Sequence, residues 1–480
     1  MKSLSTFSIF LLLAAATLSG CATTPQDQNY TVNDACPSNL EGHCHESGVV
    51  LVIGGLTVYK PNGTAGPAIR IQSARSVQIR DSKIEGATFG IEVSGGCPSC
   101  TLSIDNTTVS AQWVGLQASH YTGNIVVRGS SFSTWGQGNV TRGPLTASDP
   151  DGQTVTGPAI FVRDPAYAIE IANSTMGTVA IHDSTLVASR ASVGWAMNTH
   201  GSQLDTLVLD HMQIAGYRVA YEGRFHSGTA HHVRIQCDES AIIQSQVPFR
   251  DQAQAPSSFE AVSLDTSECS QGALRLDDAK TIKLNGFAAS GGQATIDVRY
   301  GYSMALSNFT LNRAQYGLHV QGDSTGRVSL SLAQGTVANM TYAGVQAKFL
   351  NVDVTSVRFT NNGRGWPDPN ATTFPGPLTS PVQFYGGLVW QPSPLLAEEA
   401  TQLTLAVHGS SFSKNVPYAV TAIYASSAAD CTGNWWGSGD GPQVYVGPGS
   451  AAPSPPVGAG GHGDNVTWNV RFIPFLTSPP

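Results

Sequence analysis

The chain has 480 residues, a formal net charge of −8 and only 12% charged residues, while glycine occurs 51 times. With this acidic balance and no basic run, the sequence argues against nucleic acid as a partner. The length exceeds that of a typical single domain unless the architecture is a repeat. Many small polar residues with few charges favour short strands and turns.

The first 20 residues have the features of a secretory signal peptide. Lys2 gives a positive start, residues 7–16 form an apolar run, and small residues lead to Cys21. The run is too short to span a membrane comfortably. One possibility is an ordinary signal peptide whose cleavage site happens to fall near a cysteine.

The residues Leu18-Ser19-Gly20-Cys21 resemble the lipobox of bacterial lipoproteins. In that family the cysteine thiol is acylated and becomes the first mature residue. The resemblance implies that Cys21 carries a lipid, which would tie the protein to a membrane of the cell envelope. Ala22 follows where an aspartate would favour the inner membrane, so the outer membrane is the expected location.

An exported location permits disulfides among the other cysteines. The expected pairs are local: Cys36 with Cys44, Cys97 with Cys100, and Cys237 with Cys269, which leaves Cys431 without an assigned partner. Two alternatives remain open. Cys97-Pro98-Ser99-Cys100 could be a redox pair. Cys36, His43, Cys44 and His45 could bind a metal, although the simpler expectation is that the chain holds no metal.

A repeated pattern runs through the rest of the chain: apolar, any residue, apolar, then four mostly polar residues and a further apolar residue. It recurs roughly every 20 to 29 residues, with two longer gaps. In chain order it predicts strands at Val77–Ile84, Leu102–Val109, Ile125–Phe132, Val179–Leu186, Leu207–Ile214, Val262–Cys269, Met304–Leu311, Leu330–Val337, Val352–Phe359 and Leu405–Phe412.

A second motif alternates with the first and consists of a small residue followed by apolar, any, apolar. Examples are residues 68–71, 90–93, 273–276, 295–298, 317–320 and 344–347. One such unit cannot bury a core alone, but stacked units can align their inward residues in columns. Helical periodicity is absent after the signal peptide.

These units resemble coils of the pectate-lyase-like right-handed parallel β-helix superfamily. Asn434-Trp435-Trp436-Gly437 resembles a closing motif of bacterial β-helix proteins, where aromatic rings cover the last coil. The resemblance implies an all-β solenoid of about twelve coils with a C-terminal cap. The expected organisation is a signal peptide (1–20), an anchor and N-terminal linker or cap (21–48), the β-helix (49–437) and a cap or tail (438–480).

Outward residues on stacked strands should form ladders, because alternate side chains point to the same face. In the second motif charges gather on one stretch of the ladder. This stretch predicts a ligand-binding face that comprises Arg218, Arg275, Asp277, Asp297, Arg299, His319 and Gln321. We expect Arg275 beside Asp297, and Asp277 beside Arg299.

Two long insertions, residues 133–158 and 360–402, leave after equivalent apolar residues and should flank this ladder. The second insertion contributes Trp366 and Trp390 to the predicted binding face, with Phe374, Phe384 and Tyr385 nearby. Aromatic planes can stack on sugar rings. The alternative is a purely structural role, in which the alternating charges only solvate the sheet and fix its register.

The sequence predicts an envelope lipoprotein that binds polysaccharide or a surface partner along this polar face, and leaves its oligomeric state open. The alternative is a polysaccharide lyase or glycoside hydrolase acting on an acidic glycan. Its candidate catalytic residues are Asp277, Asp297, Arg299 and His319, and a lyase could use Ca²⁺ held by the two aspartates. The Asn-Thr-Asp and Arg-Ile-Lys elements of polygalacturonases and the Arg-x-Pro-x-x-Arg element of pectate lyases are missing.

Overall fold

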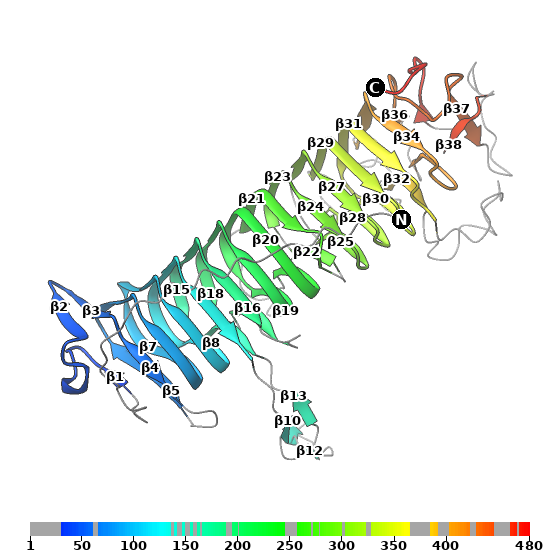
Figure 1. Ribbon diagram of the computed structural model, residues 1–480. Coiled ribbons are helices and arrows are strands. Elements are labelled where there is room, and N and C mark those ends of the chain that lie inside the picture. The colour runs from blue at the N-terminus through cyan, green and yellow to red at the C-terminus, as the bar shows by residue number, and fades with distance from the viewer. Residues whose placement is uncertain are drawn as a thin grey trace, which may run out of the picture.

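A computed structural model shows an all-β solenoid of stacked parallel strands (Figure 1). Thirty-five strands join in one continuous sheet. The structure describes residues 30–60, 66–135, 139–141, 146–148, 154–156, 161–163, 166–188, 194–199, 201–244, 257–269, 272–277, 279–299, 303–322, 328–364, 385–391, 403–422, 429–445, 461–467 and 470–480. Within these residues the only helical element is η1 (Ser38–Leu40), and no helix is long and apolar enough to cross a membrane.

Each turn of the solenoid contributes strands to three walls, which we call the ladder wall, the second wall and the third wall. The ladder wall contains β1 (Tyr30–Val32), β5 (Pro67–Ser73), β14 (Tyr167–Ala172), β17 (Trp195–Asn198), β22 (Gly272–Asp277), β25 (Ala294–Arg299), β28 (Tyr316–Gln321), β30 (Ala343–Lys348), β32 (Gly386–Gln391), β35 (Val420–Ala422) and β38 (Gly463–Thr467).

The second wall follows the ladder wall along the chain. It contains β3 (Val50–Gly54), β6 (Ser76–Arg80), β15 (Thr175–His182), β18 (Gln203–Asp210), β23 (Ala279–Asn285), β26 (Ser303–Ser307), β33 (Leu405–His408), β36 (Ala429–Asp430) and β39 (Val470–Arg471). The third wall contains β4 (Thr57–Tyr59), β9 (Ser131–Thr134), β16 (Thr185–Ala188), β24 (Ala288–Ser290), β27 (Thr310–Asn312) and β34 (Ser411–Ser413).

Longer strands bend around a corner and belong to more than one wall. These are β7 (Lys83–Asp105), β8 (Thr108–Arg128), β19 (Gln213–Gly223), β20 (Phe225–Gln244), β21 (Ser257–Thr266), β29 (Ser329–Ala338) and β31 (Asn351–Thr360). Four short strands pair only with one another as an arm beside the body (Figure 1): β10 (Asn139–Thr141), β11 (Thr146–Ser148), β12 (Thr154–Thr156) and β13 (Phe161–Arg163).

The core is a set of inward columns, as the period-2 pattern predicts. On the ladder wall one column stays in register along the body and is buried throughout: Ile69, Ile91, Leu116, Ile169, Met197, Tyr221, Ile242, Leu274, Ile296, Leu318, Val345, Leu388 and Val420. Burying such columns is the main favourable term in the stability of a stacked fold.

The corner between the second and third walls explains the polar spacer of the first motif. The corner residue has a left-handed backbone conformation on successive coils, as at Asp81 (φ 50°), Asn106 (φ 47°) and Asn308 (φ 52°). Asparagine, aspartate and glycine tolerate this conformation best. The spacer is therefore the sharp bend that separates two strands.

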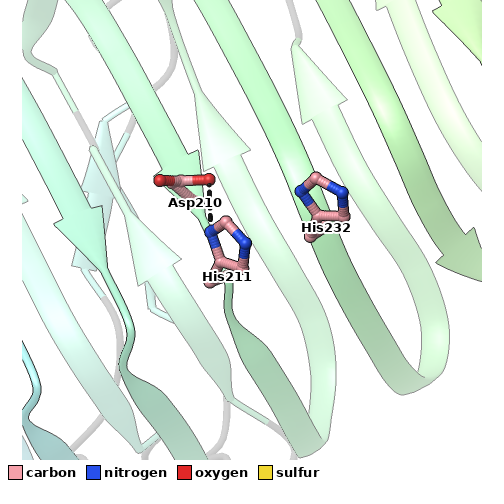
Figure 2. A group of neighbouring side chains, drawn as sticks. All are labelled: Asp210, His211 and His232. Carbon is pink, nitrogen blue, oxygen red and sulfur yellow. Dashed lines mark ion pairs between the residues drawn. The ribbon is translucent and has the colours of Figure 1, made fainter.

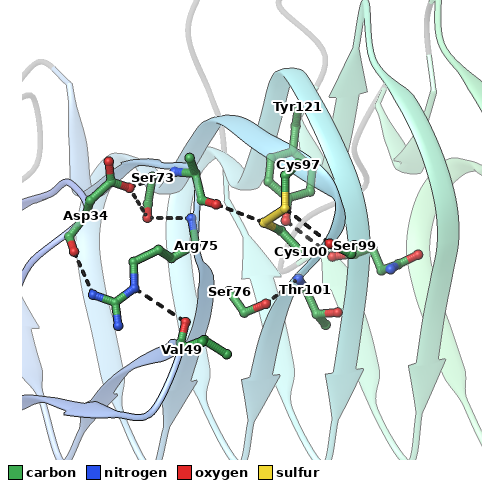
Figure 3. Close-up of a disulfide and its surroundings, with 12 residues drawn as sticks. Asp34, Val49, Ser73, Arg75, Ser76, Cys97, Ser99, Cys100, Thr101 and Tyr121 are labelled. Carbon is green, nitrogen blue, oxygen red and sulfur yellow. Dashed lines mark hydrogen bonds between the residues drawn. A yellow bond between two sulfur atoms is a disulfide. The ribbon is translucent and has the colours of Figure 1, made fainter.

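A short segment closes the N-terminal end of the solenoid through hydrogen bonds to the first coil (Figure 3). Asp34 Oδ1 accepts hydrogen bonds from Ser73 Oγ (2.9 Å) and the Ala74 N–H (2.8 Å). Arg75 donates to the carbonyl oxygens of Asp34 (2.9 Å) and Gly48 (3.0 Å). Next to it, β2 (Cys44–Ser47) pairs antiparallel with β3.

Three disulfides join the same cysteine pairs that the sequence analysis expects. Their Cα atoms are 5.6 Å apart in Cys36–Cys44, 5.0 Å in Cys97–Cys100 and 4.5 Å in Cys237–Cys269. The Cys97–Cys100 bond lies in β7 where residues 97–100 interrupt the register with β8, beside Tyr121 (Figure 3). Cys431 is a buried free thiol, and burial raises its pKa.

At the other end, aromatic rings stack along the solenoid axis. Phe359 stacks on Phe412, and Phe412 stacks on Trp436, with ring centroids 4.9 Å apart in both pairs. The amide of Asn434 accepts from the Ser410 N–H (2.8 Å) and donates to the Cys431 carbonyl (2.7 Å). Strands β37 (Pro442–Tyr445) and β38 then pair beyond the last coil.

Candidate functional site

The ladder wall carries one column of outward side chains that stays in register along the solenoid. Each rung directly follows a residue of the buried inward column, so it points to the opposite face of the wall, although Asn198, Gln346, Val389 and Thr421 are themselves buried there. In order the rungs are Arg70, Glu92, Gln117, Glu170, Asn198, Glu222, Ile243, Arg275, Asp297, His319, Gln346, Val389 and Thr421. We call this column the ladder.

Six residues of the predicted binding face occupy three neighbouring strands of the ladder wall, β22, β25 and β28. Arg275 stands opposite Asp297, and Asp277 stands opposite Arg299, as the sequence analysis expects. The ion pairs of the two arginines nevertheless run along the strands. Arg299 Nη2 lies 3.1 Å from Asp297 Oδ2, and Arg275 Nε lies 3.9 Å from Asp277 Oδ2.

Asp297 is the centre of this group. His319 Nδ1 on the next strand lies 2.9 Å from Asp297 Oδ1, so the carboxylate contacts an imidazole and a guanidinium at once. Burial alone would raise the pKa of this carboxyl, but the hydrogen bonds and positive charges of His319 and Arg299 outweigh burial and lower it. Two side chains thus hold Asp297 ionised in a fixed orientation.

The second outward position on these strands continues the polar surface. It runs through Asp277, Arg299, Gln321 and Lys348 on successive strands. Lys348 is half-buried, and this desolvation lowers its pKa. Donors and acceptors therefore repeat in two parallel columns, which suits a ligand with many hydroxyl groups spaced along its length.

Three tyrosines form a row beside this polar surface. Tyr316 begins β28, and its ring centroid lies 5.9 Å from that of His319 and 5.4 Å from that of Tyr342. Tyr342 in turn contacts Tyr385 edge-on at 5.2 Å. All three side chains are partly exposed. Burial raises the pKa of Tyr316 and Tyr385, with a further contribution from their neighbours in the row, so both stay protonated hydroxyl donors.

A second aromatic group lies further towards the N-terminus on the same wall. Tyr167 and Trp195 stack with centroids 5.5 Å apart and planes at 9°. Trp195 Nε1 donates to the carboxylate of Glu222 on the ladder. The Arg218 guanidinium lies 5.9 Å from the centre of the Trp195 ring.

Two of the predicted binding residues need correction. Arg218 is not a rung, because register shifts between Ala215 and Val219 move Glu222 into that place. Trp390 is only 1% exposed: it points inward in β32, and its Nε1 donates to the Leu350 carbonyl (2.9 Å). It therefore packs in the core and cannot stack on a ligand.

The two insertions are only partly described. The described strands within the first insertion, β10, β11 and β12, belong to the arm, whereas the second insertion contains β32 of the ladder wall. The second insertion therefore contributes a regular strand to the wall as well as flanking residues. Trp366, Phe374 and Phe384 lie outside the described residues, as does Cys21 with the predicted signal peptide.

Two metal hypotheses can be compared with the structure. The disulfide between Cys36 and Cys44 removes both thiolates from the cluster with His43 and His45. Another group, Asp210, His211 and His232, has candidate ligand atoms that all lie within 4.8 Å of one another. The sequence analysis missed it, and it lies at a corner of the second wall, away from the ladder.

Comparison with known proteins adds no assignment. No family model, curated protein or solved structure matches the chain. The function must therefore be inferred from the geometry of the ladder, the tyrosine row and the group of Asp210, His211 and His232.

Proposed function

We propose that this protein is a bacterial lipoprotein that binds an extended polysaccharide along the ladder wall. One observation carries the proposal: the row of Tyr316, Tyr342 and Tyr385 lies beside the two polar columns centred on Asp297. Aromatic faces offer stacking surfaces for sugar rings, and the fixed carboxylate, imidazole and amide groups can bind hydroxyls. A ladder that only solvated the sheet would not require a row of partly exposed tyrosines beside it.

The proposal includes a right-handed solenoid of about twelve coils, as in the pectate-lyase-like superfamily. The stacked parallel strands and the aromatic closure at Trp436 support this part. It also includes a lipid on Cys21, by which the protein would be held at the outer membrane. The lipobox-like sequence supports the lipid.

The anchor can be tested by metabolic labelling with a fatty-acid analogue in a bacterial host. The intact protein should incorporate the label and remain with membranes. Cys21→Ser should abolish incorporation. Equal labelling of this variant would remove the anchor from the proposal and leave the ladder unaffected.

Binding can be tested on a glycan array with the purified protein. The unmodified protein should bind a class of extended glycans, and Asp297→Ala, Arg299→Ala and Tyr316→Ala should each weaken the signal. Lys283→Ala is the matched control, because Lys283 is exposed on β23 in the second wall. Binding that survives the three ladder-wall changes would exclude this face.

A second candidate function is cleavage of an acidic polysaccharide. It is favoured by His319, which Asp297 orients through Nδ1 as a carboxylate orients a general base. The arginines beside Asp277 and Asp297 weaken the case for Ca²⁺ there. A lyase would produce new ultraviolet absorbance from uronates, lost in His319→Asn. No absorbance change on alginate or pectate, with or without Ca²⁺, would count against this candidate.

A further inference from the structure

Histidines and aspartates gather at the corner between the second and third walls, whereas the ladder lies on the ladder wall. Strand register and corner geometry place six of them in two adjacent columns of three, which we call the corner patch: His182, Asp210 and His231, followed by Asp183, His211 and His232. The chain has 12 histidines, and four of them lie in this patch. The histidines of the chain are therefore concentrated at one corner of the solenoid.

Asp210 lies beside His211, with which it forms an ion pair, and near His232 (Figure 2). Its Oδ1 lies 2.8 Å from His211 Nδ1, and its Oδ2 lies 3.5 Å from His182 Nδ1. The rings of His211 and His232 stack with centroids 4.6 Å apart. One ligand atom from each of Asp210, His211 and His232 falls within 4.8 Å of the others.

We propose that Asp210, His211 and His232 bind a transition-metal ion of the zinc class. Tetrahedral zinc with bonds of about 2.0–2.1 Å brings its ligand atoms to roughly 3.3 Å from one another. The three atoms must therefore approach by about 1–1.5 Å, which rotation of exposed histidine side chains can supply. The stacked rings would turn out of their parallel arrangement as both nitrogens face the ion.

The residue types at this corner support a ligand role. His211 (φ 49°) and His232 (φ 52°) both have the left-handed conformation, which other coils give to small residues such as Asn106, Gly129 and Asn308. After glycine, histidine is with asparagine and aspartate among the residues that adopt this conformation most readily. The corner therefore accepts both imidazoles and places them on adjacent coils, beside a carboxylate that can share an ion with them.

The donor set also defines the class of metal. Two imidazole nitrogens and one carboxylate oxygen suit Zn²⁺, Cu²⁺ or Ni²⁺, whereas Ca²⁺ and Mg²⁺ prefer oxygen ligands alone. Three protein ligands leave a fourth position for water. His182 is a positioning residue in this site, because it contacts the second oxygen of Asp210 and limits the rotation of the carboxylate.

The test is a calorimetric titration of the untagged protein with zinc chloride, repeated with Co²⁺, whose visible absorption reports coordination geometry. We expect one zinc per chain and no comparable heat from Ca²⁺. His211→Asn and His232→Asn place at the corner a residue that it already accepts elsewhere, so the fold should persist. Each change should weaken zinc binding at least tenfold, and His182→Asn about tenfold.

His120→Asn is the matched control, because His120 is also exposed and left-handed (φ 51°) but belongs to β8 on the ladder wall. It should leave zinc affinity and the Co²⁺ spectrum unchanged. The proposal is overturned if the unmodified protein takes up no zinc at micromolar concentration. It is also overturned if His211→Asn and His232→Asn bind zinc as the unmodified protein does.

Discussion

At the scale of single residues, the structure separates side chains of one type by their surroundings. Asp297 is paired with an arginine and a histidine, and its pKa is lowered. Asp464 is partly buried in the C-terminal cap, where the N–H groups of Lys414 and Asn415 (both 2.9 Å) donate to its two oxygens. Burial outweighs these hydrogen bonds and raises the pKa of Asp464 to about 6.

Asp464 should make the stability of the cap depend on pH. An acid with a higher pKa in the folded than in the unfolded chain binds its proton more tightly when folded. Its stabilising effect is therefore complete below about pH 4 and is lost as the pH rises to 6, by about 3 kcal/mol in total. Denaturant unfolding of the cap, followed by tryptophan fluorescence, should show this loss.

Asp464→Asn should flatten this pH dependence between 4 and 6, although it also removes one of the two oxygens that accept from the backbone N–H groups. Asp430→Asn is the control in the same region, because the pKa of Asp430 is lowered rather than raised. An unchanged slope in Asp464→Asn would show that another group titrates there.

Single residues also show where sequence reasoning reached its limit. Tyr217-Arg218-Val219 and Tyr221-Glu222-Gly223 fit a strand pattern about equally well, and only the register shifts select Glu222 as the rung. The sequence does contain a signal for the corner patch. Asp210-His211 and His231-His232 are one coil apart, but the left-handed corner that aligns them is defined only by the three-dimensional register.

At the scale of elements, the strands of the body follow from the apolar alternation and the closing motif. The unit assigned to Val262 and Leu264 was shifted, because Phe259 and Ala261 are the inward pair and Ser263 forms the corner. Strand β32 was missed since its surroundings are rich in proline. Its Leu388-Val389-Trp390 sequence nevertheless alternates inward and outward as the other ladder strands do.

The aromatic stack predicts a large cost for Trp436→Ala. The side chain is fully buried on Phe412, so its removal should destabilise the cap by about 3–5 kcal/mol. Thermal unfolding can measure the change. Trp195→Ala is the control, because Trp195 is partly exposed on the ladder wall. Equal effects of the two changes would mean that Trp436 does not close the core.

The disulfides should contribute unequally. Cys237 and Cys269 are separated by 32 positions, and Cys97 and Cys100 by 3. The chain-entropy model gives about 4 kcal/mol for the longer loop and about 2 kcal/mol for the shorter one. Denaturant unfolding of the Cys237→Ala/Cys269→Ala and Cys97→Ala/Cys100→Ala double variants should therefore show the greater loss in the first. The reverse order would contradict the entropic account.

At the scale of the whole molecule, the solenoid turns short local motifs into columns that extend over its length. The ladder, the tyrosine row and the corner patch each combine residues from successive coils. A repeat with outward polar positions could be predicted from sequence, because the period-2 pattern defines the faces. The tyrosine row could not, since Tyr342 and Tyr385 lie outside both motifs and approach Tyr316 only when the coils stack.

A calorimetric titration with an oligosaccharide series of increasing length tests whether the ladder wall binds an extended glycan. Strands on adjacent coils lie about 4.8 Å apart, so a longer ligand reaches more rungs. We expect affinity to rise with length, and this gain to be lost in Asp297→Ala and Tyr316→Ala but kept in Lys283→Ala. Equal affinity for short and long ligands, or a gain that persists in both ladder-wall variants, would contradict the account.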